Sequence, residues 1–264
     1  MSQGPQGGFA AATPPQATTL HTDDNGLRTG DAVVTVAGQA VPVYFAAPHG
    51  VASPPIVLVV QEIFGVHEHI RDVTRRLAKL GYLAVAPELY VRQGDPRSIP
   101  TIDELREKII SKVPDQQVFD DLDACIDWAV AQGGDGARVG LTGFCWGGRI
   151  AWLYAARQPR LKAAVAWYGK LVGPTNALSP RHPVDVAIGL LAPVLGLYGE
   201  QDGGIPLDTV HQMQELLVTG GTPSHIVVYP GAGHAFFADY RPSYHAPSAQ
   251  AAWSELEAWL ARWL

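Results

Sequence analysis

The stretch Gly143-Phe144-Cys145-Trp146-Gly147-Gly148 joins two different local patterns. The apolar run 139–142 before it is typical of a buried strand, and residues 149–156 after it have the pattern of a helix. A reactive side chain on a sharp strand-to-helix turn, with glycine two positions away on either side, is the nucleophile-elbow arrangement, written here as G-x-C-x-G. Glycine is required because a Cβ at either position would meet the neighbouring chain. The stretch predicts Cys145 as a nucleophile, and the start of a helix favours its thiolate.

Apolar runs and helical patterns alternate on both sides of this turn. The runs expected to form strands are residues 56–60, 82–86, 139–142, 163–167, 194–198 and 225–229. Helical patterns cover residues 68–80, 103–113, 118–131, 148–157, 207–218 and 248–264. Fully apolar strands separated by helices predict an α/β fold with a mostly parallel central sheet flanked by helices on both faces.

The first part of the chain has a different composition. Residues 1–30 are rich in Gly, Pro, Gln and Thr without periodicity, so we expect an irregular N-terminal extension. Residues 31–37 and 39–46 flank Gly38 and predict a β-hairpin. No repeat or linker divides the rest, so residues 31–264 are predicted to form a single domain.

Composition excludes several classes of partner. The 264 residues carry a net charge of −6 without a block of like charges, which disfavours nucleic acid and membrane surfaces. Two cysteines are too few for a disulfide framework, and Cys125 lies on an apolar helical face. A free thiol suits a cytoplasmic location, and export is the alternative if the N-terminus was trimmed from a signal-bearing precursor. His67-Glu68-His69 has no third ligand at suitable spacing, so we interpret it as the opening of a helix and expect no metal.

A cysteine nucleophile needs a base, and the base needs an orienting acid. In open α/β sheets both lie in loops after the carboxyl ends of strands. His234 lies in a Gly-rich loop after the last predicted strand, and Asp202 follows the strand before it. Glu200 is a rival acid, and Asp202 has the alternative role of capping the next helix. The order Cys145, Asp202, His234 is that of α/β-hydrolase triads.

The loop after residues 56–60 is expected to complete the site. The backbone N–H of Trp146, directly after the nucleophile, is one predicted oxyanion donor, and the N–H of Ile63 is the second. Glu62 is a candidate acid–base group, although capping of the following helix is an alternative role. The aromatic candidates for the substrate pocket, with core packing as the alternative, are Phe64, Tyr90, Trp167, Tyr168 and Phe236.

Four blocks in order strongly resemble the dienelactone hydrolase family: residues 60–65 (VQEIFG), 86–94 (APELYVRQG), 143–148 (GFCWGG) and 231–236 (GAGHAF). The resemblance runs from about residue 31 to the end of the chain. It implies an α/β-hydrolase fold, no cofactor and a Cys145–His234–Asp202 triad. It also implies that Glu62 lies near the resting thiol and accepts its proton when substrate displaces it, and that Arg92 pairs with Glu62 or with a substrate carboxylate.

The sequence departs from the family at one place. Dienelactone hydrolases proper carry a second arginine a few residues after the catalytic histidine, where this chain has Ala238 or Asp239, and Arg241 is offset. The chain therefore resembles the broader branch of the family, and neutral esters are favoured over dienelactone.

We predict a hydrolase of carboxylic esters or lactones that forms an acyl-enzyme on Cys145. The alternatives are a general carboxylesterase without dienelactone activity and a non-catalytic α/β-hydrolase scaffold. The expected partner is a small ester or lactone, and the expected assembly is a monomer, with a homodimer as the alternative.

Overall fold

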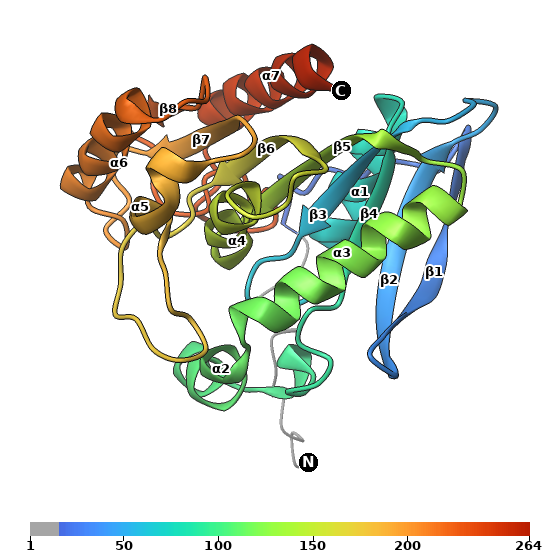
Figure 1. Ribbon diagram of the computed structural model, residues 1–264, viewed down its shortest axis with the longest axis horizontal. Helices are drawn as coiled ribbons and strands as arrows, with labels where there is room; N and C mark the ends of the chain where they lie inside the picture. Colours follow the sequence, from blue (N-terminus) through green and yellow to red (C-terminus); the bar gives the residue numbers. More distant parts are fainter. Residues whose placement is uncertain (1–15) are drawn as a thin grey trace.

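Eight strands form one sheet in the computed structural model, which describes residues 16–264 (Figure 1). Six of them, β3 to β8, pair in parallel, and the hairpin of β1 and β2 joins antiparallel beside β4. The spatial order is β1-β2-β4-β3-β5-β6-β7-β8. The strands are β1 (Leu27–Val36), β2 (Gln39–Pro48), β3 (Pro55–Val60), β4 (Leu83–Pro87), β5 (Asp135–Phe144), β6 (Leu161–Trp167), β7 (Val194–Gly199) and β8 (His225–Tyr229).

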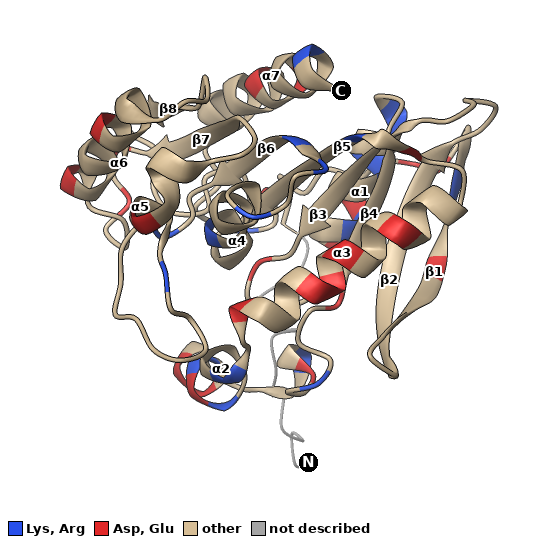
Figure 2. Ribbon diagram, viewed as in Figure 1, with Lys and Arg blue, Asp and Glu red and all other residues tan. Residues whose placement is uncertain are grey.

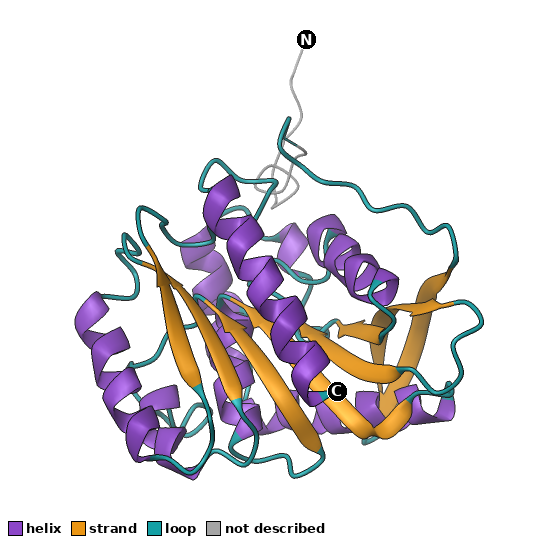
Figure 3. Cartoon of the chain, turned by 90° about the horizontal axis from the view of Figure 1, so that it is seen from above, coloured by secondary structure: helices purple, strands orange, loops and turns teal. Residues whose placement is uncertain are grey.

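Helices cover both faces of this sheet. α1 and α7 share one face, and α3 and α4 pack on the other (Figures 1 and 3). The helices are α1 (Glu68–Lys79), α2 (Ile102–Lys108), α3 (Asp115–Ala131), α4 (Trp146–Ala155), α5 (Pro183–Val186), α6 (Leu207–Thr219) and α7 (Ala246–Trp263), with 3₁₀ turns η2 (Pro96–Ser98), η3 (Ile110–Lys112) and η4 (Ala187–Gly189). The predicted mostly parallel sheet between two helical layers is confirmed.

Burial on both faces explains why the central strands are apolar throughout. All of β4 and all of β3 beyond Pro55 are buried, and both strands lie near the middle of the sheet. Full burial of one such side chain contributes about 1.5–3 kcal/mol. Between the sheet and α7 the rings stack: Phe144 lies 5.6 Å from Phe237, which lies 5.6 Å from Trp253. Trp253 therefore packs α7 against the sheet through the rings of Phe237 and Phe144.

Several element boundaries differ from the sequence prediction, and three of these differences have a clear structural basis. β1 begins at Leu27, so residues 27–30 belong to the hairpin rather than to the N-terminal extension. The helix expected over 103–113 divides into α2 and η3, because Ile109 leaves helical geometry with φ −119° and ψ −66°. β5 begins at Asp135, whose N–H bonds to the carbonyl of Pro54. The expected irregularity of residues 1–15 concerns residues outside the described part of the chain.

Acidic residues gather along α3 (Figure 2). Four of these carboxylates accept from arginines of other segments, in the pairs Asp115–Arg149, Asp121–Arg92, Asp123–Arg157 and Asp127–Arg160. These four ion pairs balance four of the carboxylates of α3 and attach the helix to the segments that carry Arg92, Arg149, Arg157 and Arg160.

The turn between β5 and α4 is the tightest part of the fold. Cys145 has φ +55° and ψ −112°, a strained conformation for a residue with a side chain. A Cβ on Gly143 would lie 2.1 Å from the carbonyl oxygen of Gly147. A Cβ on Gly147 would lie 2.5 Å from the carbonyl oxygen of Val60. Only glycine lets the first turn of α4 approach β3 so closely.

Gly143→Ala is therefore expected to lower the free energy of unfolding by at least about 3 kcal/mol, because a backbone oxygen has no room to move aside. Chemical denaturation measures the change. Gly221→Ala is the matched control: it is exposed and nothing lies within 4 Å of its added Cβ. Equal stability of the two variants would contradict the steric explanation.

Candidate active site

Three loops at the carboxyl edge of the sheet bring a thiol, an imidazole and a carboxylate together. Cys145 lies on the turn after β5, Asp202 follows β7 and His234 follows β8. The Nε2 atom of His234 is 3.2 Å from Sγ of Cys145, and its Nδ1 atom is 2.7 Å from Oδ2 of Asp202. The rival acid Glu200 instead accepts the N–H of Gly231 at 3.1 Å.

The surroundings of His234 favour its protonated form. Burial alone would lower the pKa of the imidazole, but the hydrogen bonds with Asp202 and Cys145 outweigh burial and raise the pKa from 6.5 to about 10. Because the folded pKa exceeds the unfolded one, this contribution to stability is complete below pH 6.5 and is lost as the pH rises through about 10. The arrangement can hold a proton on His234 while sulfur carries negative charge.

The first turn of α4 lies directly against the loop after β3. An added Cβ on Gly147 would also lie 2.6 Å from the carbonyl oxygen of Gln61, so this loop and the turn are in contact. The N–H groups of Ile63 and Trp146 have no hydrogen-bond acceptor among residues 16–264. Both donors are thus available to an oxygen near Cys145, as an oxyanion hole requires.

Glu62 is buried beside a histidine and a tyrosine. Its Oε2 atom accepts the hydroxyl of Tyr240 at 2.6 Å and lies 3.3 Å from Nε2 of His67. Burial alone would raise the pKa of Glu62, but the hydrogen bond from His67, the positive charges that His67 and His69 carry when they are protonated, and the hydrogen bond from Tyr240 together hold it well below its usual range. Burial lowers the pKa of His67. Glu62 is therefore ionised at neutral pH, with a neutral imidazole beside it.

Arg92 does not make the pair with Glu62 that the resemblance implied. Its guanidinium forms two bonds of 2.7 Å to Asp121 on α3. Arg241 is closer to the site: its guanidinium lies 5.6 Å from the ring centre of Phe64, and its positive charge offsets part of the rise that burial causes in the pKa of Tyr168. In the described part of the chain Arg241 makes no ion pair.

Two tyrosines lie next to the reacting groups. The ring of Tyr168 meets that of His234 at 5.3 Å, and the ring of Tyr90 meets that of Trp146 at 4.9 Å. Burial raises the pKa of both tyrosines well above the ordinary value, and negative charge at Cys145 raises it further. Both tyrosines are fully buried, so in this structure they pack beside the site without being exposed to solvent.

The other aromatic candidates take part in packing. Trp167 bonds through its indole N–H to Thr142 and contacts Phe237 at 4.4 Å. Phe236 is fully buried and packs between Tyr168 and Tyr229. Phe64 is also buried, under the guanidinium of Arg241.

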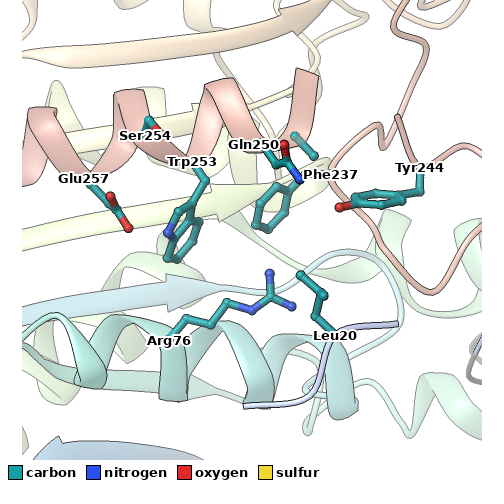
Figure 4. Close-up of a pocket in the computed structure, with 9 residues that line it drawn as sticks. Leu20, Arg76, Phe237, Tyr244, Gln250, Trp253, Ser254 and Glu257 are labelled. Carbon is teal, nitrogen blue, oxygen red and sulfur yellow. The ribbon is translucent and has the colours of Figure 1, made fainter. Parts of the chain in front are cut away.

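A separate groove of about 350 Å³ runs between α1 and α7 (Figure 4). Arg76 reaches into it from α1, opposite Trp253 of α7. None of the triad residues lines this groove, so it is distinct from the candidate active site.

The two residues bonded to Glu62 are not among the site residues predicted from sequence. The sequence presents His67 only as part of the motif His67-Glu68-His69, and it gives no signal for Tyr240. His67 follows Glu62 by five residues in the same loop, a spacing that could have suggested contact. Tyr240 is 178 residues from Glu62, and only the fold brings the two together.

The remaining candidates have buried or paired positions. Cys125 is fully buried, and burial raises its pKa. His69 lies 3.2 Å from Asp239 through Nδ1. Across residues 16–264 no group of three potential ligands is placed to hold a metal ion, and no helix there is both long and apolar enough to cross a membrane.

A mostly parallel sheet of this order, with a cysteine, an aspartate and a histidine following its strands in that sequence at the carboxyl edge, has the arrangement of an α/β-hydrolase. The model of the dienelactone hydrolase family matches residues 41–264. The chain belongs to this family of hydrolases that act on carboxylic ester bonds.

Similar proteins cover nearly the whole chain. A Salmonella typhimurium protein named "Putative carboxymethylenebutenolidase" is 54% identical over 98% of this chain and 96% of its own length. A Methylorubrum extorquens protein of the same name is 56% identical over 96% and 88%. The crystal structure of a "Putative Dienelactone Hydrolase" from Klebsiella pneumoniae has 56% identity and a TM-score of 0.88, covering 90% of this chain and 99% of that one.

Asp202→Asn is expected to lower the pKa of His234 toward its ordinary value, because the charge that stabilises the imidazolium is removed. A pH titration of the histidine resonances by NMR measures the shift. Asp208→Asn is the control, since Asp208 lies in the first turn of α6 and bonds only to Thr209. If the pKa of His234 is the same in Asp202→Asn as in the wild type, Asp202 is not the group that raises it.

Proposed function

We propose that the protein hydrolyses carboxylic esters or lactones through a covalent acyl-enzyme on Cys145. The observation that carries this proposal is the continuous contact of Sγ with Nε2 of His234 at 3.2 Å and of Nδ1 with Asp202 at 2.7 Å. A thiol with an adjacent base, itself oriented by an acid, is the general form of an activated nucleophile.

The first half of the reaction forms the acyl-enzyme. His234 takes the proton of the Cys145 thiol, and sulfur attacks the carbonyl carbon of the ester. The N–H groups of Ile63 and Trp146 stabilise the resulting oxyanion. When the intermediate collapses, the C–O bond breaks and the leaving oxygen takes the proton from His234.

The second half releases the acid. His234 removes a proton from water, the hydroxide attacks the thioester carbon, and the same two N–H groups stabilise the second oxyanion. The C–S bond breaks and sulfur recovers its proton from His234. No cofactor is needed, because Cys145 and a water molecule supply the two nucleophiles and the protons, and His234 transfers those protons. Esters and lactones suit this chemistry better than amides, because an alkoxide is a much better leaving group than the amide anion.

Arg241 supports a more specific proposal on substrate class. Its guanidinium makes no ion pair with residues 16–264 and lies beside Phe64, which follows the proposed oxyanion donor directly. A charged group next to a reacting centre without a protein counter-ion suits an anionic substrate. We therefore propose that the site accepts esters that carry a carboxylate, with Arg241 as the group that attracts it, in spite of its offset position in the sequence.

Cys145→Ala is expected to reduce hydrolysis of 4-nitrophenyl acetate at least about 10³-fold, because the attacking atom is lost. The release of nitrophenolate measures the rate. Cys125→Ala removes the other, buried thiol and is expected to retain activity. Iodoacetamide should label Cys145 and leave Cys125 unmodified in the native protein. Full activity of Cys145→Ala would refute the proposal.

Arg241→Ala is expected to lower kcat/KM about tenfold for 4-nitrophenyl hydrogen succinate and to leave 4-nitrophenyl acetate almost unchanged. The two esters share a leaving group, so their ratio isolates the carboxylate. Arg262→Ala is the control, because Arg262 on α7 also makes no ion pair with any described residue and lies over the ring of Trp263. Equal loss on both esters would mean that Arg241 does not select for charge.

A further inference from the structure

The carboxylate of Glu62 is held by only one of its two oxygens. Oε2 has two partners, the hydroxyl of Tyr240 at 2.6 Å and Nε2 of His67 at 3.3 Å. Oε1 is buried and has no partner in the described part of the chain. A buried carboxylate oxygen without a donor costs free energy, so such an atom invites a functional explanation.

The two donors come from segments far apart in the sequence, and their rings are held in place by contacts with each other and with neighbouring residues. His67 lies at the start of α1, and its ring packs edge-on against Tyr240 at 4.9 Å. The same ring stacks on His69 at 6.1 Å. His69 contacts Asp239, which accepts a 2.6 Å bond from Arg76. Contacts with residues of α1 therefore hold the rings of His67 and Tyr240 in the positions from which they bond to Glu62.

The charges around Glu62 do not replace this pair of donors. Arg92 is bound to Asp121. The titratable and charged groups near the carboxylate are His67 and His69 at the start of α1, Asp239, Tyr240 and Arg241 in the loop after His234, and Tyr168 after β6. Among residues 16–264 only His67 and Tyr240 bond to the Glu62 side chain, so its orientation depends on them.

The position of Glu62 relates it to the nucleophile. Negative charge on Glu62 and on Cys145 both act on Tyr168, whose ring contacts His234. Glu62 also directly precedes Ile63, the proposed second oxyanion donor. A change in the orientation or charge of Glu62 is therefore expected to alter the reaction of the ester at Cys145.

We propose that His67 and Tyr240 are positioning residues that hold Glu62 as an oriented carboxylate, with Oε1 free to act at the Cys145 site. This inference rests on the proposed esterase function. The neutral imidazole of His67 donates a hydrogen bond without cancelling the negative charge, as a paired arginine would. Glu62 thereby remains an anion without a counter-ion bonded to it.

A double-mutant cycle tests the inference. Tyr240→Phe is expected to lower kcat for 4-nitrophenyl acetate about tenfold, and His67→Leu by a similar factor. In a Glu62→Gln background both changes should have less than a twofold effect, because their target is absent. His67→Gln, which keeps a donor near the position of Nε2, should retain most of the activity. Equal losses in both backgrounds would overturn the proposal, since a merely structural role does not depend on Glu62.

The pH profile supplies a second readout. Tyr240→Phe removes a donor that stabilises the charged form, so the pKa of Glu62 rises and the acid limb of kcat/KM should move to higher pH. Tyr244→Phe is the matched control, a nearby tyrosine that lines the groove of Figure 4 and makes no bond to Glu62. An acid limb that is the same in wild type and Tyr240→Phe would count against the proposal.

The alkylation rate of Cys145 by iodoacetamide separates this inference from the proposed function, because it needs no ester. If the wild type fails to hydrolyse esters, the function is refuted, and the same cycle is then measured on alkylation. A Glu62-dependent effect of Tyr240→Phe on that rate supports the positioning role. An effect that is the same with Glu62→Gln overturns it.

Discussion

The reactive edge of the sheet depends on how closely the first turn of α4 approaches β3 and β6. Added methyl groups on Gly147 and Gly148 would lie 2.5 Å from the carbonyl of Val60 and 2.4 Å from that of Trp167. The backbone N–H of Cys145 also bonds to the Trp167 carbonyl at 2.9 Å. This contact forces Cys145 into its unusual backbone conformation and raises the thiol above the strand ends. The apolar core on either side offsets the cost of that strain.

Two carboxylate–imidazole pairs lie at this edge, and burial gives them opposite properties. His234 is 37% exposed, and its partners Asp202 and Cys145 raise its pKa to about 10. The side chain of His67 is only 8% exposed, and burial lowers its pKa although Glu62 lies beside it. The first imidazole can therefore carry a proton during a reaction cycle, whereas the second acts as a neutral hydrogen-bond donor. The same two functional groups serve a chemical and a geometric purpose.

The features of the fold and site that can be predicted from the sequence are those marked by a pattern of neighbouring residues. Strand and helix types followed from apolar periodicity, and the glycines around Cys145 marked the turn. Asp202 and His234 could be named because both lie in loops directly after predicted strands. Arg92 was assigned through the resemblance alone, and its bond to Asp121 depends on the packing of α3. Tyr240 and Arg241 lie beside Glu62 and Phe64 only after the chain has folded, and no spacing rule connects positions so far apart.

The beginning of the described chain is joined to this same region. Thr18 donates to the carbonyl of Asp239, next to Tyr240, and the N–H of Thr22 bonds to Asp72 on α1. Asp72 in turn holds Arg76, which holds Asp239. Shortening the chain past Thr22 would therefore remove these two hydrogen bonds to the segments that carry His69 and Tyr240. The first described residues thus contribute to the order of the loop that holds Tyr240, although Thr18 and Asp239 are 221 positions apart in the sequence.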